Sequence, residues 1–414
     1  MNVQRIAQIA KESSAAIAAA TAGQKNAALR AMAEKLAIRK KDIIAANEGD
    51  LTYAESSGVA RNLLDRLLFG ETKIDARVGA LHRIQALPDP IGQTIHTERR
   101  PNGLEVTKLR VPLGAILVIY EARPHVTVNA GALCLKSGNS VILRGGSEAR
   151  QCNALLGFLW AESLADAGLP PEAIQVVSGP HEEIDVLLEQ DEYISLVIPR
   201  GGEGLIEAVA AKSRIPVIKH AGGVCHVYID EGADVSRSIS IALDSKCLMP
   251  EVCNAMETLL VSQHLGAALP MIAGRLHKSG VKIRGCDRTR AIIPEVEPAT
   301  EEDWTTEYLD TIVSVRVVTD LRQAIEHINR YGSHHTDAIV TDSESRAREF
   351  VQKVDSAVVL VNASTMFCDG ESLGMGAEIG ISTDRLHARG PMGLEELTTY
   401  KFVIRGEGHV MAGQ

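Results

Sequence analysis

The chain has 414 residues, which suggests two or three domains. Its hydrophobic share of 45% and charged share of 23% are those of an ordinary globular protein. With 43 Lys and Arg against 53 Asp and Glu, and only 3% aromatic residues, it lacks the basic footprint and the stacking surface of a nucleic-acid binder.

The cysteines indicate a reducing compartment. Seven occur, at irregular spacing and without a C-x-x-C pair, which argues against a disulfide framework and against a zinc site. The N-terminus lacks the continuous apolar core of a signal peptide, and no apolar run approaches the roughly 20 residues of a membrane span. We therefore expect a cytoplasmic protein that has no bound metal and does not enter a membrane.

Helical spacing extends over residues 2 to 86, where apolar positions recur three and four residues apart and Gly23 and Gly58 look like breaks. Two polar runs at 93–100 and 103–110 then flank an Asn-Gly pair, which predicts a hairpin. Because this hairpin has no obvious core to cover, we expect it to pair with another subunit; a solvated flap is the alternative. A terminal strand is expected at 398–405 and could pair with the hairpin of the same or a neighbouring subunit.

From residue 114 apolar strands alternate with helices, as in a parallel sheet that is covered on both faces. Strands are expected at 114–120, 140–144, 174–177, 194–198 and 216–218. A second alternating unit follows, with strands expected at 256–261 and near 281–284, 311–317, 336–341 and 357–361. The irregular segment from 287 to 307 is expected to be a surface loop. The fold class is therefore α/β with two parallel-sheet domains.

Three loops at the carboxyl ends of the first set of strands are candidates for a cofactor site, because ligands of such sheets bind there. They span 120–125, 144–148 and 199–204. The last two combine an arginine with paired glycines before a helix, which suits a phosphate group. Neither is a G-x-G-x-x-G fingerprint, so a standard Rossmann site is not indicated. Arg144 ends a strand where a cation would suit the 2′-phosphate of NADP.

Cys253 is the candidate nucleophile. It lies in a turn-like segment after Pro250 and is followed by Asn254 and an apolar run that predicts a buried strand. Reactive side chains usually lie on loops that rigid elements hold in place. The alternative is a buried, inert thiol, which is the commoner state of a cysteine taken at random.

Long motifs occur in order along the chain, among them Tyr120-Glu121-Ala122-Arg123-Pro124, Leu135-Lys136-Ser137-Gly138-Asn139, Val252-Cys253-Asn254-Ala255, Tyr331-Gly332-Ser333, Gly376-Ala377-Glu378-Ile379-Gly380 and Leu386-His387-Ala388-Arg389-Gly390. In these motifs the chain resembles the gamma-glutamyl phosphate reductase family, of the aldehyde dehydrogenase superfamily, over essentially its whole length. The resemblance implies reduction of L-glutamyl 5-phosphate to L-glutamate 5-semialdehyde by NADPH, with release of phosphate, in proline biosynthesis.

The resemblance also implies an aldehyde-dehydrogenase-like architecture in three parts. A cofactor-binding domain would comprise 1–91 and 112–224, a catalytic domain 225–392, and a small β oligomerisation element 92–111 and 393–414. A homo-oligomer is therefore expected. Glutamate 5-kinase, which would supply the unstable acyl phosphate, is a candidate partner.

The resemblance assigns roles to residues around the nucleophile. Cys253 matches the catalytic cysteine of the superfamily. Ala122 replaces the asparagine that usually donates to the oxyanion hole; the Cys253 backbone N–H remains, and Asn254 or Arg123 could supply another donor. His220 replaces the glutamate that activates water for hydrolysis, which agrees with a reductase, although an ordinary interior histidine is the alternative.

Two further sets of residues complete the predicted site. The cofactor would contact Arg144, Gly145, Gly146, Ser147, Pro199, Arg200, Gly201, Gly202 and Glu307. The resemblance places Glu307 at the nicotinamide ribose of the cofactor. The phosphate and the α-carboxylate of the substrate would contact Arg123, Arg385, His387 and Arg389, because arginine binds both groups bidentately. For each arginine, an ordinary ion pair is the alternative.

Two other functions remain open. An aldehyde dehydrogenase that oxidises another aldehyde is one, and His220 in place of the hydrolytic glutamate argues against it. A non-catalytic protein that kept the fold is the other, and Cys253 together with the glycine loops argues against it.

Overall fold

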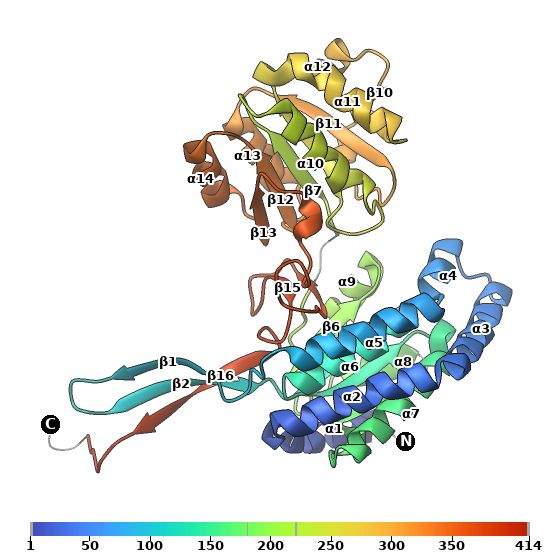
Figure 1. Cartoon of the computed structure of the whole chain (residues 1–414), viewed down its shortest axis with the longest axis vertical. Coiled ribbons are helices and arrows are strands. Elements are labelled where there is room, and N and C mark those ends of the chain that lie inside the picture. The colour runs from blue at the N-terminus through green and yellow to red at the C-terminus, as the bar shows by residue number, and fades with distance from the viewer. Residues whose placement is uncertain (1–2, 180, 220–221, 412–414) are drawn as a thin grey trace. The chain divides into compact units, whose positions relative to one another are not determined.

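Two parallel β-sheets, each within its own unit of the chain, form the framework of the protein (Figure 1). The computed structural model describes residues 3–179, 181–219 and 222–411. The first unit comprises Met1–Lys219, Gly374–Gly380 and Met392–Gln414, and the second comprises His220–Leu373 and Ile381–Pro391. The α/β class with two parallel sheets, which the alternation of apolar strands and helices predicted, is confirmed.

Helices make up the N-terminal part of the first unit, as their spacing predicted. They are α1 (Val3–Ala19), α2 (Ala22–Ile38), α3 (Lys40–Ser56), α4 (Arg61–Leu67) and α5 (Glu71–Ala86). A capping box starts α2, in which the Gln24 N–H donates to Thr21 Oγ1 at 3.2 Å and the Thr21 N–H donates to Gln24 Oε1 at 3.1 Å. Gly23 therefore lies inside α2, and the break precedes it. None of the helices in the described part of the chain is long and apolar enough to cross a membrane.

The sheet of the first unit has the strand order β5-β4-β3-β6, and all of its pairs are parallel. Its elements are β3 (Ala115–Tyr120), α6 (Pro124–Lys136), β4 (Ser140–Gly145), α7 (Arg150–Asp166), β5 (Ile174–Val177), α8 (His181–Leu188), β6 (Leu196–Arg200) and α9 (Glu203–Lys212). Both β3 and β4 are buried throughout, which explains the continuous apolar sequence of β3 and the apolar residues 141–143 of β4. The strand expected at 216–218 is reduced to a single bridge between Val197 and Val217.

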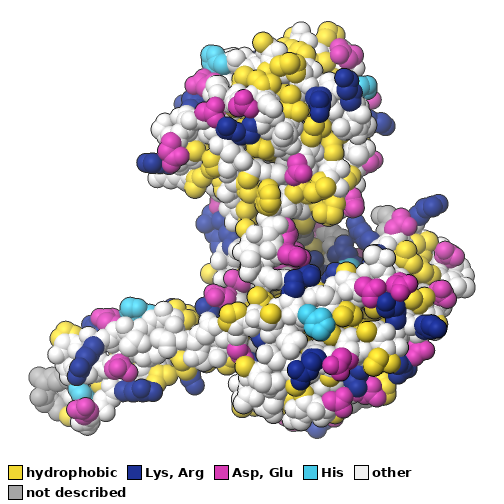
Figure 2. Space-filling view, in the orientation of Figure 1, with side chains coloured by type: hydrophobic (Ala, Val, Ile, Leu, Met, Phe, Trp, Pro, Cys, Tyr) yellow, Lys and Arg dark blue, Asp and Glu magenta, His cyan; other side chains and the backbone are white. Residues whose placement is uncertain are grey.

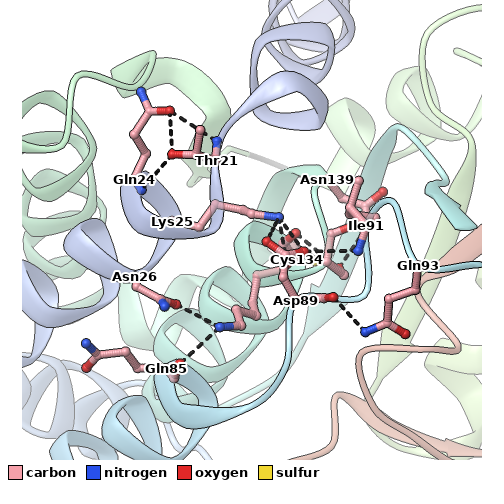
Figure 3. Close-up of polar contacts among 12 residues, drawn as sticks. Thr21, Gln24, Lys25, Asn26, Gln85, Asp89, Ile91, Gln93, Cys134 and Asn139 are labelled. Atoms are coloured by element: carbon pink, nitrogen blue, oxygen red, sulfur yellow. Dashed lines mark hydrogen bonds and ion pairs between the residues drawn. The ribbon is translucent and has the colours of Figure 1, made fainter.

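A buried polar network joins the N-terminal helices to the segment that leads into the hairpin (Figure 3). Lys25 of α2, whose side chain is 1% exposed, lies 2.6 Å from Asp89 Oδ2. Lys136 at the end of α6 donates to Asn26 Oδ1 at 2.7 Å and to the Gln85 carbonyl at 3.0 Å. Burial lowers the pKa of Lys136. The network therefore fixes the point at which the chain leaves the helices.

Replacing Lys25 with methionine is expected to lower the free energy of unfolding by about 3 kcal/mol, because Asp89 would lose the partner of its buried ion pair. Urea unfolding followed by circular dichroism measures this change. Lys40→Met is the matched control, because the partners Glu71 and Asp75 are 71% and 56% exposed and such pairs stabilise little. An equal loss of stability in the two variants would contradict the prediction.

Three antiparallel strands form a ribbon that extends from the helices of the first unit (Figure 1). They are β1 (Thr94–Arg99), β2 (Glu105–Pro112) and β16 (Thr398–Arg405). The predicted hairpin and terminal strand are confirmed, and β16 pairs with β2 of the same chain, with Tyr400 opposite Arg110. Every residue of β1 is exposed. In β16, Phe402 and Ile404 expose 62% and 61% of their surface. Hydrophobic, basic and acidic side chains occur together on the visible face of the ribbon (Figure 2).

The second unit contains a seven-stranded parallel sheet with the order β10-β9-β11-β8-β7-β12-β13. Its elements are β7 (Cys225–Ile229), α10 (Val235–Cys247), β8 (Met256–Ser262), α11 (Leu269–Lys278), β9 (Lys282–Gly285), α12 (Asp287–Ile292), β10 (Glu297–Pro298), β11 (Ile312–Val318), α13 (Leu321–Tyr331), β12 (Thr336–Val340), α14 (Glu344–Lys353) and β13 (Val358–Val361). The expected surface loop at 287–307 is wrong in part, because it contains α12 and β10. Two short strands, β14 (Gly380–Ser382) and β15 (Gly390–Met392), pair separately.

Candidate active site

Five segments of the second unit lead into neighbouring strands of its sheet. In sheet order they precede β11, β8, β7, β12 and β13, and they carry Glu307, Cys253, Gly223, Ser333 and Asp355. Because the strands are parallel, all five segments lie at the amino edge of the sheet. This differs from the carboxyl edge at which such sheets usually bind ligands, which is where the three predicted loops of the first unit lie.

Cys253 is half-buried in a turn just before β8. Its carbonyl accepts a hydrogen bond from the thiol of Cys225 at 3.2 Å. A Cβ atom on Gly223 would lie 1.6 Å from the same carbonyl, so only glycine allows this close approach. Cys225 itself is fully buried, and burial raises its pKa well above the ordinary value, as expected of an inert thiol. The two neighbouring cysteines therefore lie in different environments.

Asn254 anchors the cysteine turn. It is 7% exposed, and its Nδ2 donates to the carbonyls of Thr365 at 3.1 Å and Met366 at 3.3 Å. Both amide hydrogens are thus directed at backbone carbonyls of the 3₁₀ helix Thr365–Phe367. This geometry favours a positioning role, and the predicted donation to an oxyanion stays a prediction.

Glu307 lies close to the cysteine turn. Its Oε1 accepts a hydrogen bond from the Gly223 N–H at 2.6 Å, and Gly223 in turn abuts the Cys253 carbonyl. The structure therefore brings together the predicted nucleophile and the glutamate expected at the nicotinamide ribose. His220, the other predicted catalytic residue, lies outside the described residues.

Two of the three arginines predicted to bind substrate, Arg385 and Arg389, contact Asp355. Arg385 Nη2 lies 2.6 Å from Asp355 Oδ2, and Arg389 Nη1 lies 2.9 Å from Asp355 Oδ1. Burial acts to raise the pKa of Asp355, but the two arginines outweigh it and the pKa is lowered. The ion-pair alternative is thus present for both arginines, and their contact with substrate stays a prediction. His387 is exposed.

In the first unit, two carboxylates join the three predicted loops, which follow the neighbouring strands β4, β3 and β6. Glu148 Oε1 accepts a hydrogen bond from the Ala122 N–H at 2.6 Å. Glu121 Oε2 accepts one from the Gly202 N–H, at the start of α9, at 3.1 Å. The carboxylate of Glu121 therefore occupies the N–H donor at the start of α9 that a phosphate oxygen would use.

The glycines of two of these loops allow the carboxylates of Glu121 and Glu148 to pack against the backbone. A Cβ on Gly201 would lie 2.5 Å from a Glu121 oxygen, and one on Gly146 would lie 2.0 Å from a Glu148 oxygen. Arg200 ends β6, and its buried Nε has no hydrogen-bond partner. This buried guanidinium nitrogen of Arg200 is the feature of the loops that fits a phosphate-bearing cofactor. Pro199 is buried within β6, and Ser147 is exposed after β4.

Arg144 differs from its predicted role in one respect. It is 5% exposed, and its two terminal nitrogens donate to the carbonyls of Gly145 at 2.8 Å and Gly179 at 2.7 Å. Burial lowers its pKa. The guanidinium thus joins the end of β4 to the segment that follows β5. Its contact with a 2′-phosphate stays a prediction.

Four cations, Arg123, Arg200, Lys73 and Arg77, act electrostatically on His125 near the start of α6. Arg123 immediately precedes this helix and provides no side-chain cap, and Arg200 ends the adjacent β6. Lys73 and Arg77, four residues apart, lie on one face of α5. Burial, followed by these four charges, lowers the pKa of His125 to about 3. Sequence analysis missed Lys73 and Arg77, although their helical spacing was a usable signal.

Comparison with known proteins places the chain in a family. The sequence model of the aldehyde dehydrogenase family matches residues 1–278. A gamma-glutamyl phosphate reductase of Moorella thermoacetica is 49% identical over 412 residues, which is 99% of each sequence. The chain belongs to the gamma-glutamyl phosphate reductases of the aldehyde dehydrogenase family. It is thus a member of a family of oxidoreductases, as the motifs around Cys253 predicted.

Solved structures agree with membership of the gamma-glutamyl phosphate reductase family. The reductase of Thermotoga maritima is 43% identical and superposes with a TM-score of 0.96 over 99% of this chain and 100% of that one. The reductase of Saccharomyces cerevisiae is 30% identical, with a TM-score of 0.57 over 100% of both chains. Across 3–179, 181–219 and 222–411, the structure groups no three His, Cys, Asp or Glu side chains in a way that could hold a metal ion.

Proposed function

We propose that the protein reduces L-glutamyl 5-phosphate to L-glutamate 5-semialdehyde with NADPH, releasing phosphate, as a step of proline biosynthesis. The observation that carries this proposal is the environment of Cys253. Its half-buried turn rests on Gly223, which also donates to Glu307, so a nucleophile and a cofactor contact are held by one glycine. The names of the relatives at 49% and 43% identity supply the substrate.

The chemistry assigned to the chain is acyl transfer to sulfur. The Cys253 thiolate attacks the acyl carbon, the C–S bond forms, and the bond to the phosphate oxygen breaks, so that inorganic phosphate leaves. Backbone N–H groups at the cysteine turn stabilise the oxyanion. When bound, NADPH supplies the hydride that reduces the resulting thioester to the aldehyde and frees the sulfur.

Charged residues of each unit suit the anions of the reaction. In the first unit, the loops at Gly146 and Gly201 would hold the cofactor phosphates, and Arg144 would lie near its adenosine ribose. The cations around His125 offer a positive region for an anionic group of the substrate. In the second unit, Arg385, His387 and Arg389 remain candidates for the same role.

The proposal extends to the oligomeric state of the protein, to its partner and to its cellular compartment. The exposed β1 strand and the apolar side chains of β16 suit contact with a second copy of the chain, so a homo-oligomer built on this ribbon is proposed. The lability of an acyl phosphate favours direct transfer from glutamate 5-kinase. The irregular spacing of the seven cysteines, without a C-x-x-C pair, suits the cytoplasm.

The dependence of the reverse reaction on phosphate tests this function. Purified protein would be incubated with L-glutamate 5-semialdehyde and NADP, with and without inorganic phosphate, and NADPH formation followed by absorbance. We expect turnover only with phosphate, because a thioester without an activated water is released by phosphate attack. Equal rates without phosphate would identify an ordinary oxidative aldehyde dehydrogenase and overturn the proposal. Repeating the assay with NAD measures the cofactor preference.

A further inference from the structure

A buried ion pair lies beneath the cysteine turn. Lys246, near the end of α10, places its Nζ 2.6 Å from Oε2 of Glu257, the second residue of β8. The two side chains are 0% and 1% exposed. A charge pair removed from water in this way is costly to form, and replacing it by apolar side chains often stabilises a protein. Its presence four residues after Cys253 therefore calls for a role other than stability.

The second carboxylate oxygen of Glu257 reaches the segment that carries Glu307. Its Oε1 accepts a hydrogen bond from the Leu309 N–H at 3.3 Å. Leu309 has a φ of 51°, which lies in the left-handed region that residues other than glycine rarely adopt. A backbone held in such a conformation requires contacts that specify it. Glu257 supplies one of these contacts from inside the sheet.

These contacts close a ring. Leu309 follows Glu307 by two residues, Glu307 accepts from the Gly223 N–H, and Gly223 abuts the Cys253 carbonyl. From Cys253 the chain runs directly into β8 and back to Glu257. The nucleophile and Glu307 are thus joined on one side through Gly223 and on the other through Glu257 and Leu309.

We propose that Glu257 and Lys246 are positioning residues, which hold Glu307 and the Cys253 turn in one fixed relation. Lys246 orients the carboxylate, and the carboxylate sets the backbone at Leu309. The inference rests on the proposed function, in which Cys253 attacks the acyl carbon and Glu307 contacts the nicotinamide ribose. The pair touches neither substrate nor cofactor and acts through these two residues.

The charges that face Glu257 predict a dependence on pH. Lys246 faces it from α10 and Glu307 from the segment before β11. Burial raises the pKa of Glu257 to about 7, Lys246 opposes this rise, and Glu307 adds to it. A proton on Glu257 weakens its acceptance from Leu309 and leaves the Lys246 charge uncompensated. The fixed relation should therefore be firmer above pH 7 than below it.

Glu257→Gln tests the inference with two readouts that do not require turnover. Fluorescence titration measures the Kd for NADPH, and iodoacetamide alkylation of Cys253 is followed as a function of pH. In the unmodified protein, the alkylation profile should show an inflection near pH 7 besides that of the thiol. Glu257→Gln should remove this inflection and weaken NADPH binding about tenfold, or about 1.4 kcal/mol.

Two further variants keep the test decisive. The double variant Glu257→Gln with Lys246→Met removes both charges, should fold where the single variant fails, and should also lack the inflection. Arg346→Met is the matched control, because Arg346 pairs with the buried Asp230 at 2.6 Å at the carboxyl edge of the same sheet. It should lower the melting temperature and change neither readout.

The outcomes separate the inference from the proposed function. If Glu257→Gln and the double variant keep both the inflection and the NADPH affinity, the pair is only structural and the inference is overturned. If both readouts change but the unmodified protein shows no phosphate-dependent turnover, the positioning role stands and the proposed function fails.

Discussion

Serine in place of Cys253 is expected to abolish turnover. A serine hydroxyl is not ionised near neutral pH, whereas the thiolate is the form of cysteine that attacks carbonyl carbon. Loss of the group that forms the covalent intermediate should lower kcat by about 1,000-fold or more. The residual rate is measured as phosphate-dependent NADPH formation with L-glutamate 5-semialdehyde.

The serine variant should still bind NADPH, because the loops assigned to the cofactor phosphates lie in the first unit. Cys247→Ser is the matched control, because Cys247 is also half-buried and lies in the same unit, at the end of α10. It should retain nearly full activity. Comparable rates in the two variants would show that the Cys253 sulfur takes no part in the reaction.

Alanine in place of Gly223 is expected to lower kcat about 100-fold, the loss that a misplacement of reacting groups by about 1 Å can cause. The added Cβ would lie 1.6 Å from the Cys253 carbonyl, which belongs to the backbone and cannot rotate away. Either the cysteine turn or the Gly223 segment must shift. A shift of Gly223 also disturbs its hydrogen bond to Glu307, so both sides of the site are affected.

Gly274→Ala is the control for this prediction. Gly274 lies in α11, and outside the adjacent residues and the backbone of this helix nothing in the described part of the chain lies within 4 Å of the Cβ that alanine would add. Alanine in a helix interior should stabilise the protein by about 0.5 to 1 kcal/mol and leave kcat unchanged. Steady-state kinetics and thermal unfolding of the two variants provide the comparison. Normal turnover in Gly223→Ala would show that catalysis does not require the close packing of Gly223 on the cysteine turn.

Most elements of the fold could be predicted from sequence because their residues are buried on both faces. Strand β3 is a continuous apolar run, and a short run of this kind between turn signals is typical of a buried strand. The missed strand β7 begins with Cys225 and His226, and its histidine is buried only because Asp337 of the neighbouring β12 accepts from it at 2.8 Å. A contact between residues 111 positions apart leaves no local pattern.

The site was predictable in its residue types but not in its arrangement. Cys253 and Glu307 were selected, and the structure brings both to Gly223. Their closeness to one another was not predicted, because it depends on which strands become neighbours. The pairing of Arg385 and Arg389 with Asp355, and the approach of Lys73 and Arg77 to His125, likewise depend on tertiary packing that periodicity does not encode.

At the carboxyl edge of the second unit's sheet, a separate group of polar contacts holds the strand ends together. Asp230, which directly follows β7, accepts from Thr341 at 2.8 Å as well as from Arg346, and it is fully buried. The amino edge of the sheet thus carries the residues proposed to react, whereas the contacts of Asp230 at the carboxyl edge hold strand ends together. Substitutions at the far edge are therefore expected to alter resistance to heating more than the rate of the proposed reaction.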